Sequence, residues 1–193
     1  ALCRDRDIPV YGPARETIPE MDHPLGDGDR VRLATPDLEL DVLEVPGHTL
    51  GHIAFYAPRQ GWLFCGDTLF AGGCGRLFEG TPEQMHHSLT RLAGLPEDTQ
   101  VFCAHEYTLA NLRFAATVSP EDPAVSDRLA RVSALREQDR ITVPSTIGEE
   151  KRTNPFLRAA DPQLRQACEA RFGEAPETNV DSFAALRRWK DSA

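Results

Sequence analysis

The sequence of 193 residues lacks several features that would place it outside the ordinary globular proteins. It contains no apolar run near the roughly 20 residues that a membrane-spanning helix requires. None of its five cysteines forms a Cys-x-x-Cys pair, which excludes a zinc finger and a disulfide-stapled miniprotein. Basic residues number 21 against 30 acidic residues, and this net charge of −9 argues against a nucleic-acid-binding surface. We expect a protein of a reducing, cytoplasmic environment that binds neither a membrane nor nucleic acid.

Charge and periodicity both change near residue 110. Residues 1–110 contain 8 basic and 17 acidic residues, whereas residues 111–193 contain 13 of each. Strand-like alternation and short apolar runs dominate the first part, and helical spacing dominates the second. We therefore predict an α/β domain over residues 1–110 and an α-helical C-terminal subdomain over residues 111–193.

Local patterns predict the individual elements. Short apolar or alternating segments predict strands over residues 8–11, 30–34, 38–45, 52–57, 62–65 and 101–104. Thr81 and Gln84 form a capping box around Pro82, which predicts a helix that begins there and ends near Leu92. After Tyr107 the spacing predicts helices over residues 108–118, 123–140, 161–172 and 181–190.

Three of the predicted strands are followed by a polar residue that can bind a metal. His48 follows the strand that ends at Val45, Asp67 follows Cys65-Gly66, and His105 follows the strand 101–104. Strand ends meet at a common edge of a sheet, so these side chains are expected to converge. Imidazole and carboxylate ligands suit zinc, iron or manganese. The sequence thus predicts a metal site at this edge.

Four blocks of sequence resemble a known family. They are residues 46–52 (PGHTLGH), 66–70 (GDTLF), 72–80 (GGCGRLFEG) and 104–108 (AHEYT), and residues 154–158 (NPFLR) and 186–191 (LRRWKD) extend the match. In this order they resemble the hydroxyacylglutathione hydrolases (glyoxalase II) of the metallo-β-lactamase superfamily. The resemblance implies the α/β fold of that superfamily, a metallo-β-lactamase αββα sandwich followed by an α-helical C-terminal subdomain.

The resemblance also implies a dinuclear metal site. His48 would bind the first metal, His105 the second, and Asp67 would bridge both as the catalytic carboxylate, with His52 in a supporting role. Two divalent ions, most simply Zn²⁺ although iron and manganese accept the same ligands, would hold a bridging hydroxide. This hydroxide would attack the thioester of S-D-lactoylglutathione and release glutathione and D-lactate, the second step of methylglyoxal detoxification.

Glutathione carries two carboxylates, and its recognition requires fixed cations and hydroxyl groups. The resemblance assigns this task to five residues: Arg76, Phe78, Tyr107, Arg187 and Lys190. It also implies a monomeric protein. Phe78 stands where some relatives have tyrosine, so a hydrogen bond from that hydroxyl is absent. Arg187 and Lys190 are three residues apart on a predicted helix and share one of its faces.

The family motif His-x-His-x-Asp-His, which supplies most of the metal ligands, does not occur in the sequence. The chain begins at Ala1, without methionine, and we expect an N-terminally incomplete form of the sandwich that by itself hydrolyses its substrate negligibly. Two other interpretations remain open. One is a related enzyme such as a persulfide dioxygenase, and the other is a non-catalytic glutathione-binding fragment.

Overall fold

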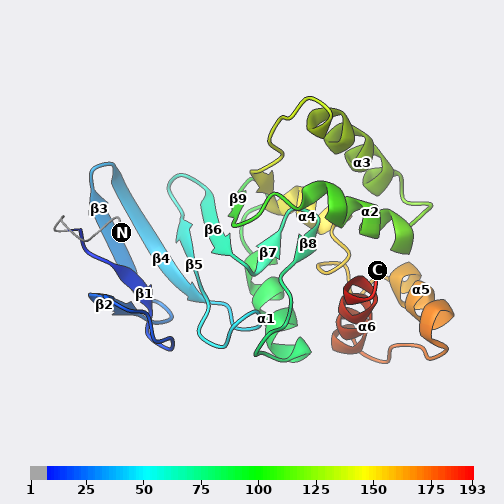
Figure 1. The fold of residues 1–193 in the computed structure, drawn as a ribbon, viewed down its shortest axis with the longest axis horizontal. Helices are drawn as coiled ribbons and strands as arrows, with labels where there is room; N and C mark the ends of the chain where they lie inside the picture. Colours follow the sequence, from blue (N-terminus) through cyan, green and yellow to red (C-terminus); the bar gives the residue numbers. More distant parts are fainter. Residues whose placement is uncertain (1–7) are drawn as a thin grey trace.

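A six-stranded mixed sheet forms the centre of the computed structural model, which describes residues 8–193 (Figure 1). Its strand order is β10-β9-β6-β5-β4-β3, and only β6 and β9 pair in parallel. The strands are β3 (Arg30–Ala34), β4 (Asp37–Glu44), β5 (Ile53–Ala57), β6 (Trp62–Gly66), β9 (Gln100–Cys103) and β10 (Ser145–Thr146). The edge strand β10 comes from the helical part of the chain, so the two parts share one sheet.

Helices cover one face of this sheet and build the main core with it. They are α1 (Pro82–Ala93), α2 (Thr108–Val118), α4 (Ile147–Thr153), α5 (Pro162–Phe172) and α6 (Asn179–Asp191), whereas α3 (Pro123–Arg136) packs on α2 and α4. Leu63 and Val101 project from the sheet onto Leu89 of α1 in a cluster that also contains Phe156 and Phe183. Each such buried side chain contributes about 1.5–3 kcal/mol through removal of apolar surface from water. Since α1, α4 and α6 all enter this core, the helical part is fixed against the sheet.

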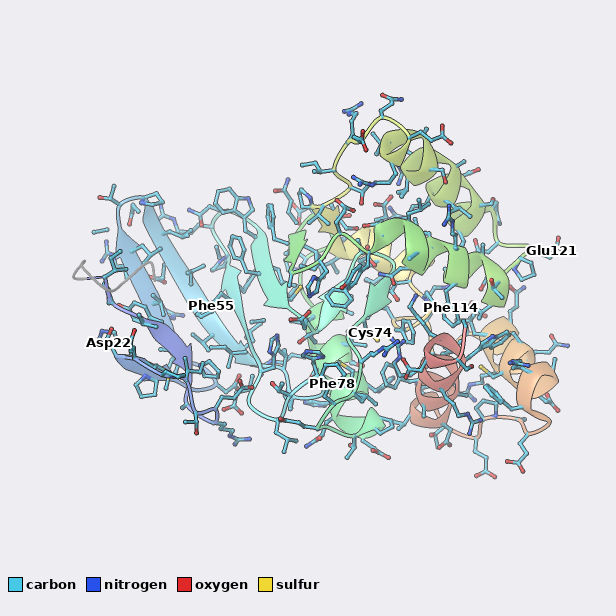
Figure 2. All side chains as sticks on the ribbon, viewed as in Figure 1. Asp22, Phe55, Cys74, Phe78, Phe114 and Glu121 are labelled. Atoms are coloured by element: carbon cyan, nitrogen blue, oxygen red, sulfur yellow. The ribbon has the colours of Figure 1, made fainter. Side chains whose placement is uncertain are left out.

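The opposite face of the sheet is only partly covered. The small parallel sheet of β1 (Tyr11–Pro13) and β2 (His23–Leu25) places Leu25 in a second cluster with Val31 and Val42. Further along the same face, Phe55 pairs with Phe64, which stacks on Phe102 with ring centroids 5.2 Å apart. Phe64 remains 37% exposed. In this aromatic row, Phe55–Phe64–Phe102, Phe64 is exposed and the other two rings are half-buried, so water reaches an apolar surface; Figure 2 labels Phe55.

The predicted elements are present, but two differ clearly in their bounds, and five short elements were not predicted: β2, β7 (Leu69–Phe70), β8 (Gly73–Cys74), β10 and α4. The first strand occupies residues 11–13 instead of 8–11. The helix predicted over 123–140 ends at Arg136, because Asp139 adopts a positive φ of 53° and the Arg140 N–H bonds back to Leu135 O. The seven-residue α4 was not predicted, because Gly148 disfavours a helix and the segment is too short to show helical periodicity. The capping box of Thr81 and Gln84 at the start of α1 is confirmed.

Among residues 8–193 no helix combines the length and the apolar character needed to cross a membrane.

Replacement of Phe64 by serine is expected to lower the tendency of the protein to aggregate, because it interrupts the exposed aromatic row. The substitution should lower the free energy of unfolding by about 1 kcal/mol, since the side chain is not fully buried. Light scattering during heating measures the effect, and Tyr11→Ser, at a similarly exposed aromatic outside the row, is the control. Equal scattering by both variants would contradict the prediction.

Candidate functional site

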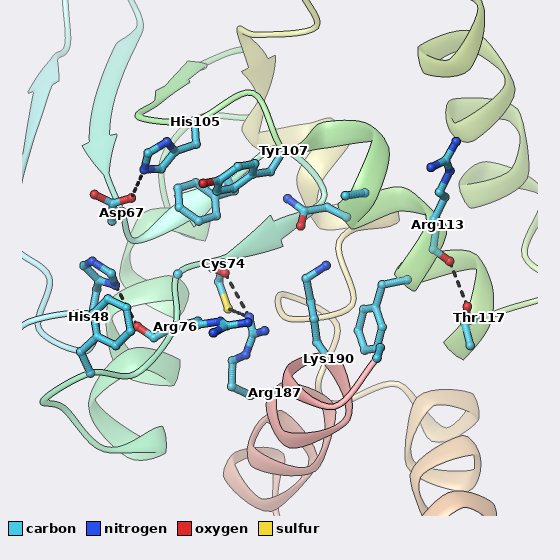
Figure 3. A pocket seen from close by; sticks show the side chains of 17 residues that line it. His48, Asp67, Cys74, Arg76, His105, Tyr107, Arg113, Thr117, Arg187 and Lys190 are labelled. Atoms are coloured by element: carbon cyan, nitrogen blue, oxygen red, sulfur yellow. Dashed lines mark hydrogen bonds and ion pairs between the residues drawn. The ribbon is translucent and has the colours of Figure 1, made fainter. Parts of the chain in front are cut away.

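One cavity of about 720 Å³ lies where the loops at the sheet edge meet α2 and α6 (Figure 3). Its lining includes all eight residues that were predicted for the metal and substrate sites: His48, Asp67, Arg76, Phe78, His105, Tyr107, Arg187 and Lys190. Cys74 and Phe114 also line it, and Figure 2 places them between the sheet and the C-terminal helices. The structure therefore brings together residues that are as far apart in the chain as His48 and Lys190.

The three predicted metal ligands occupy one end of the cavity. His105 Nε2 lies 3.1 Å from Asp67 Oδ1. His48 Nδ1 donates a hydrogen bond to the carbonyl oxygen of Arg76 over 2.9 Å, which leaves the lone pair of Nε2 free. The Tyr107 ring stacks on His105 with centroids 4.7 Å apart and, together with Phe70, restricts the orientation of that imidazole.

These donors fit a divalent metal in chemical type but not in number. Zinc, iron and manganese take imidazole and carboxylate ligands, and a structural or catalytic site uses three or four of them for each ion. Within residues 8–193, no group of three or more His, Cys, Asp or Glu side chains is arranged to hold a metal ion. The donors of the described residues therefore match a metal site in chemical type and are too few to form one.

His52 fixes the backbone beside Asp67. The Asp67 N–H donates to His52 Nε2 over 3.0 Å. Burial, with a smaller contribution from the charge of His48, lowers the pKa of His52, so its ring is neutral and accepts this bond near pH 7. Gly66 has a φ of +52°, and a Cβ there would lie 2.5 Å from His52 Nε2. Only glycine therefore allows the imidazole to approach the turn that orients Asp67.

The short hairpin of β7 (Leu69–Phe70) and β8 (Gly73–Cys74) connects Asp67 to Arg76. Side chains from the helical part hold its turn: Glu150 accepts from the Gly72 N–H over 2.8 Å, and Asn154 donates to the carbonyl oxygen of Gly73 over 2.9 Å. Asn111 donates to the carbonyl oxygen of Ala71 over 3.0 Å. These contacts determine where both ends of the cavity lie relative to each other.

Glu150 is completely buried and forms an ion pair with Arg128, which is 2% exposed. The Nη2 of Arg128 donates to Glu150 Oε1 over 2.6 Å, and Ser145 donates to the same oxygen. Nothing in the one-dimensional pattern identified this carboxylate, because it lies in the helix that the sequence did not predict. The Thr146-x-x-Glu149 spacing was the available signal, since Thr146 caps α4 at the Glu149 N–H.

Cations line the other end of the cavity. The Arg187 guanidinium is only 5% exposed, and it donates to the Cys74 carbonyl oxygen over 3.1 Å and to Asp191 Oδ1 over 2.9 Å. Burial and the charge of Arg187 lower the pKa of Lys190 to about 8. Burial also raises the pKa of the Cys74 thiol to about 11, which excludes a thiolate near neutral pH.

The sequence did not predict the contribution of α2 to the lining. Ala110, Arg113, Phe114 and Thr117 all face the cavity from this helix, at spacings of three and four residues. Such a face mixes charged, apolar and hydroxyl side chains, so that it has no hydrophobic periodicity to detect. Arg113 is among the lining residues, and its guanidinium extends away from Lys190 in Figure 3.

Comparisons with known proteins agree with this geometry. Residues 4–105 match the model of the metallo-beta-lactamase superfamily, and residues 106–193 match the model of the hydroxyacylglutathione hydrolase C-terminus. The chain has the fold of ETHE1 from Myxococcus xanthus (TM-score 0.59, 24% identity, 99% of this chain and 69% of that chain). It likewise resembles a metallo-beta-lactamase from Staphylococcus aureus (TM-score 0.52, 21% identity, 95% of this chain and 46% of that chain). The class is therefore the metallo-β-lactamase superfamily, as the resemblance of the sequence blocks implied, and membership implies binding of divalent metal ions.

Sequence relatives define the family within this class. The hydroxyacylglutathione hydrolase of Pseudomonas entomophila is 57% identical over 193 residues, which cover 99% of this chain and 74% of that protein. The corresponding protein of Alkalilimnicola ehrlichii is 55% identical over 192 residues, or 100% of this chain and 74% of that protein. The chain belongs to the hydroxyacylglutathione hydrolase family, a family of thioester hydrolases.

Replacement of Glu150 by alanine is expected to lower the free energy of unfolding by about 3–5 kcal/mol, because it leaves the buried Arg128 without its partner. It should also release the β7–β8 turn, seen as faster hydrogen exchange of the Gly72 amide. Glu149→Gln is the matched control, since Glu149 pairs with the same arginine but is 26% exposed. A Glu150 variant as stable as the control would contradict this role for the buried pair.

Proposed function

We propose that the protein acts on S-(2-hydroxyacyl)glutathione, such as S-D-lactoylglutathione, and that the reaction is hydrolysis of the thioester to glutathione and D-lactate. The observation that carries the proposal is a single cavity with metal-capable donors at one end and cations at the other. A glutathione thioester has the matching polarity, with carboxylates on its peptide and a reactive carbonyl beyond its sulfur. The names of the relatives support the same substrate class.

The cations and aromatic rings would bind the peptide part of the substrate. Arg76 has a side chain that is 65% exposed, and together with Lys190 it offers the charges that carboxylates require. Phe78 and Tyr107 are 70% and 50% exposed, so each presents a ring to the ligand. Tyr107 also offers a hydroxyl group, which Phe78 lacks. Arg187 would act mainly by fixing Cys74 and the end of α6, because its Nη1 already donates to Cys74 and its Nη2 to Asp191.

We propose zinc as the metal, with His48, Asp67 and His105 as ligands and Asp67 placed between the two histidines. When bound, such an ion lowers the pKa of a coordinated water and polarises a carbonyl group. The residues themselves orient these donors: the Arg76 carbonyl oxygen holds His48, and His52 holds the Asp67 backbone. Three donors are fewer than two ions need, and this shortage determines what the chain alone is expected to do.

Two parts of the chain divide these tasks in this proposal. Residues 1–110 carry the metal donors, and residues 111–193 carry the helices of the glutathione-binding end; the ranges of the two family models support this division. We also propose a monomer that acts in the detoxification of methylglyoxal. The four cysteines of the described part are free, which fits the reducing environment of the cytoplasm.

The chain alone should bind a glutathione conjugate but not turn it over. We expect saturable binding of S-hexylglutathione by titration calorimetry, fewer than two zinc ions for each chain by elemental analysis, and negligible hydrolysis of S-D-lactoylglutathione. Arg76→Ala should weaken the binding, whereas Arg59→Ala, a similarly exposed arginine outside the cavity, should not.

Absence of any binding to S-hexylglutathione would overturn the proposed substrate class. Full turnover with two bound zinc ions would instead contradict the expected shortage of ligands. Binding of S-hexylglutathione by a chain that retains no zinc even when zinc is added in excess would favour the second candidate function, a non-catalytic glutathione-binding chain, which the incomplete donor set supports.

Affinity for the conjugate should fall as the pH rises through about 8. The pKa of Lys190 is lowered to about 8 by burial and by Arg187, while Asp191 raises it, so the ammonium group is present below this pH and lost above it. Calorimetry between about pH 6.5 and pH 9.5 measures the effect. Lys190→Gln should bind more weakly at low pH and show a flat profile. The same slope in this variant would exclude Lys190 as the titrating group.

A further inference from the structure

The carboxylate of Asp191 joins the two arginines of the cavity. Its Oδ1 lies 2.9 Å from Arg187 Nη2 and 3.5 Å from Arg76 Nε. Arg187 belongs to α6 and Arg76 to the loop after β8, and both line the cavity. Figure 3 shows these two guanidinium groups close together beside Cys74. Without a ligand, the Asp191 carboxylate thus supplies the negative charge that pairs with both arginines at this end of the cavity.

The rules of helix stability do not account for an aspartate at this position. Asp191 is the last residue of α6, where the negative end of the helix dipole disfavours a carboxylate. The pair with Arg187 has the basic residue first and the acidic residue four positions later, the weaker of the two possible orders. A residue that opposes local preferences in this way is a sign of a role in a site.

Arg187 does not need Asp191 to keep its position. Its Nη1 donates to the Cys74 carbonyl oxygen over 3.1 Å, and its guanidinium lies 5.1 Å from the centre of the Phe156 ring. Arg76 is held less firmly, because its side chain is 65% exposed and its ion pair with Asp191 is long. Removal of the Asp191 charge would therefore leave one anchored and one movable cation without a counter-charge.

We propose that Asp191 is a built-in competitor for ligand carboxylates and so determines how strongly anionic ligands bind. A ligand carboxylate must take over the interaction with Arg76 and reduce that of Asp191 with Arg187. A thioester without carboxylates cannot replace Asp191 at these arginines and is therefore expected to bind more weakly. This inference rests on the proposed function in its choice of ligand, a glutathione thioester that carries two carboxylates.

Calorimetry with S-hexylglutathione tests the competition. Asp191→Asn should bind roughly two- to five-fold more tightly than the unchanged protein, the range expected for one partly exposed ion pair. Asp191→Glu keeps the charge and should bind like the unchanged protein. Glu169→Gln removes one charge from an exposed position on α5 and controls for the net charge. The gain should shrink from about 0.01 M to about 1 M salt, as the Debye length falls from about 30 Å to about 3 Å.

A second probe separates this inference from the proposed function. Sulfate is an anion unrelated to glutathione, and its binding raises the midpoint of thermal unfolding by mass action. A larger sulfate-induced rise in Asp191→Asn than in Glu169→Gln supports the competition, even if no variant binds S-hexylglutathione and the proposed substrate fails. Equal or weaker binding of both probes by Asp191→Asn would overturn the inference, even if the unchanged protein binds the conjugate.

Discussion

The buried ion pair of Glu150 and Arg128 is the interaction on which the site depends. Glu150 joins α4 to the Gly72 amide in the β7–β8 turn, and Arg128 joins the same carboxylate to α3. Burial of two opposite charges is costly, and it is tolerated here because every oxygen of Glu150 has hydrogen-bond partners. Through this pair, the helical part of the chain determines the position of a hairpin that lies in the α/β part.

That hairpin separates two chemically different ends of one cavity. Asp67 precedes it and meets His105, while Arg76 follows it and meets Asp191. At the first end, hydrogen bonds from and to the backbone orient the donors, and at the second end a carboxylate already pairs with two of the cations. A small shift of the hairpin would change both ends together, since only a few residues lie between them.

The long periodic elements and the metal-capable residues were accessible from the sequence. Strands β3 and β4 alternate clearly, and α1 begins with a capping box, so local patterns were sufficient. The lining from α2 and the bridging position of Asp191 were not accessible. Arg113 lies on a helix face without periodicity, and Asp191 resembles any charged residue at a helix end until its partners, far away in the sequence, are known.

The sequence by itself determined the family, the class of fold and the chemical type of each donor, because these properties depend on short motifs and on residue identity. Only the tertiary structure decided which donors meet. It placed all eight predicted residues in one cavity, showed that Arg187 is already engaged, and revealed that no group of three or more donors among the described residues is arranged to hold a metal ion. The physical reason is that hydrogen bonds and ion pairs require atoms a few ångströms apart, and the long-range packing of the core sets those distances.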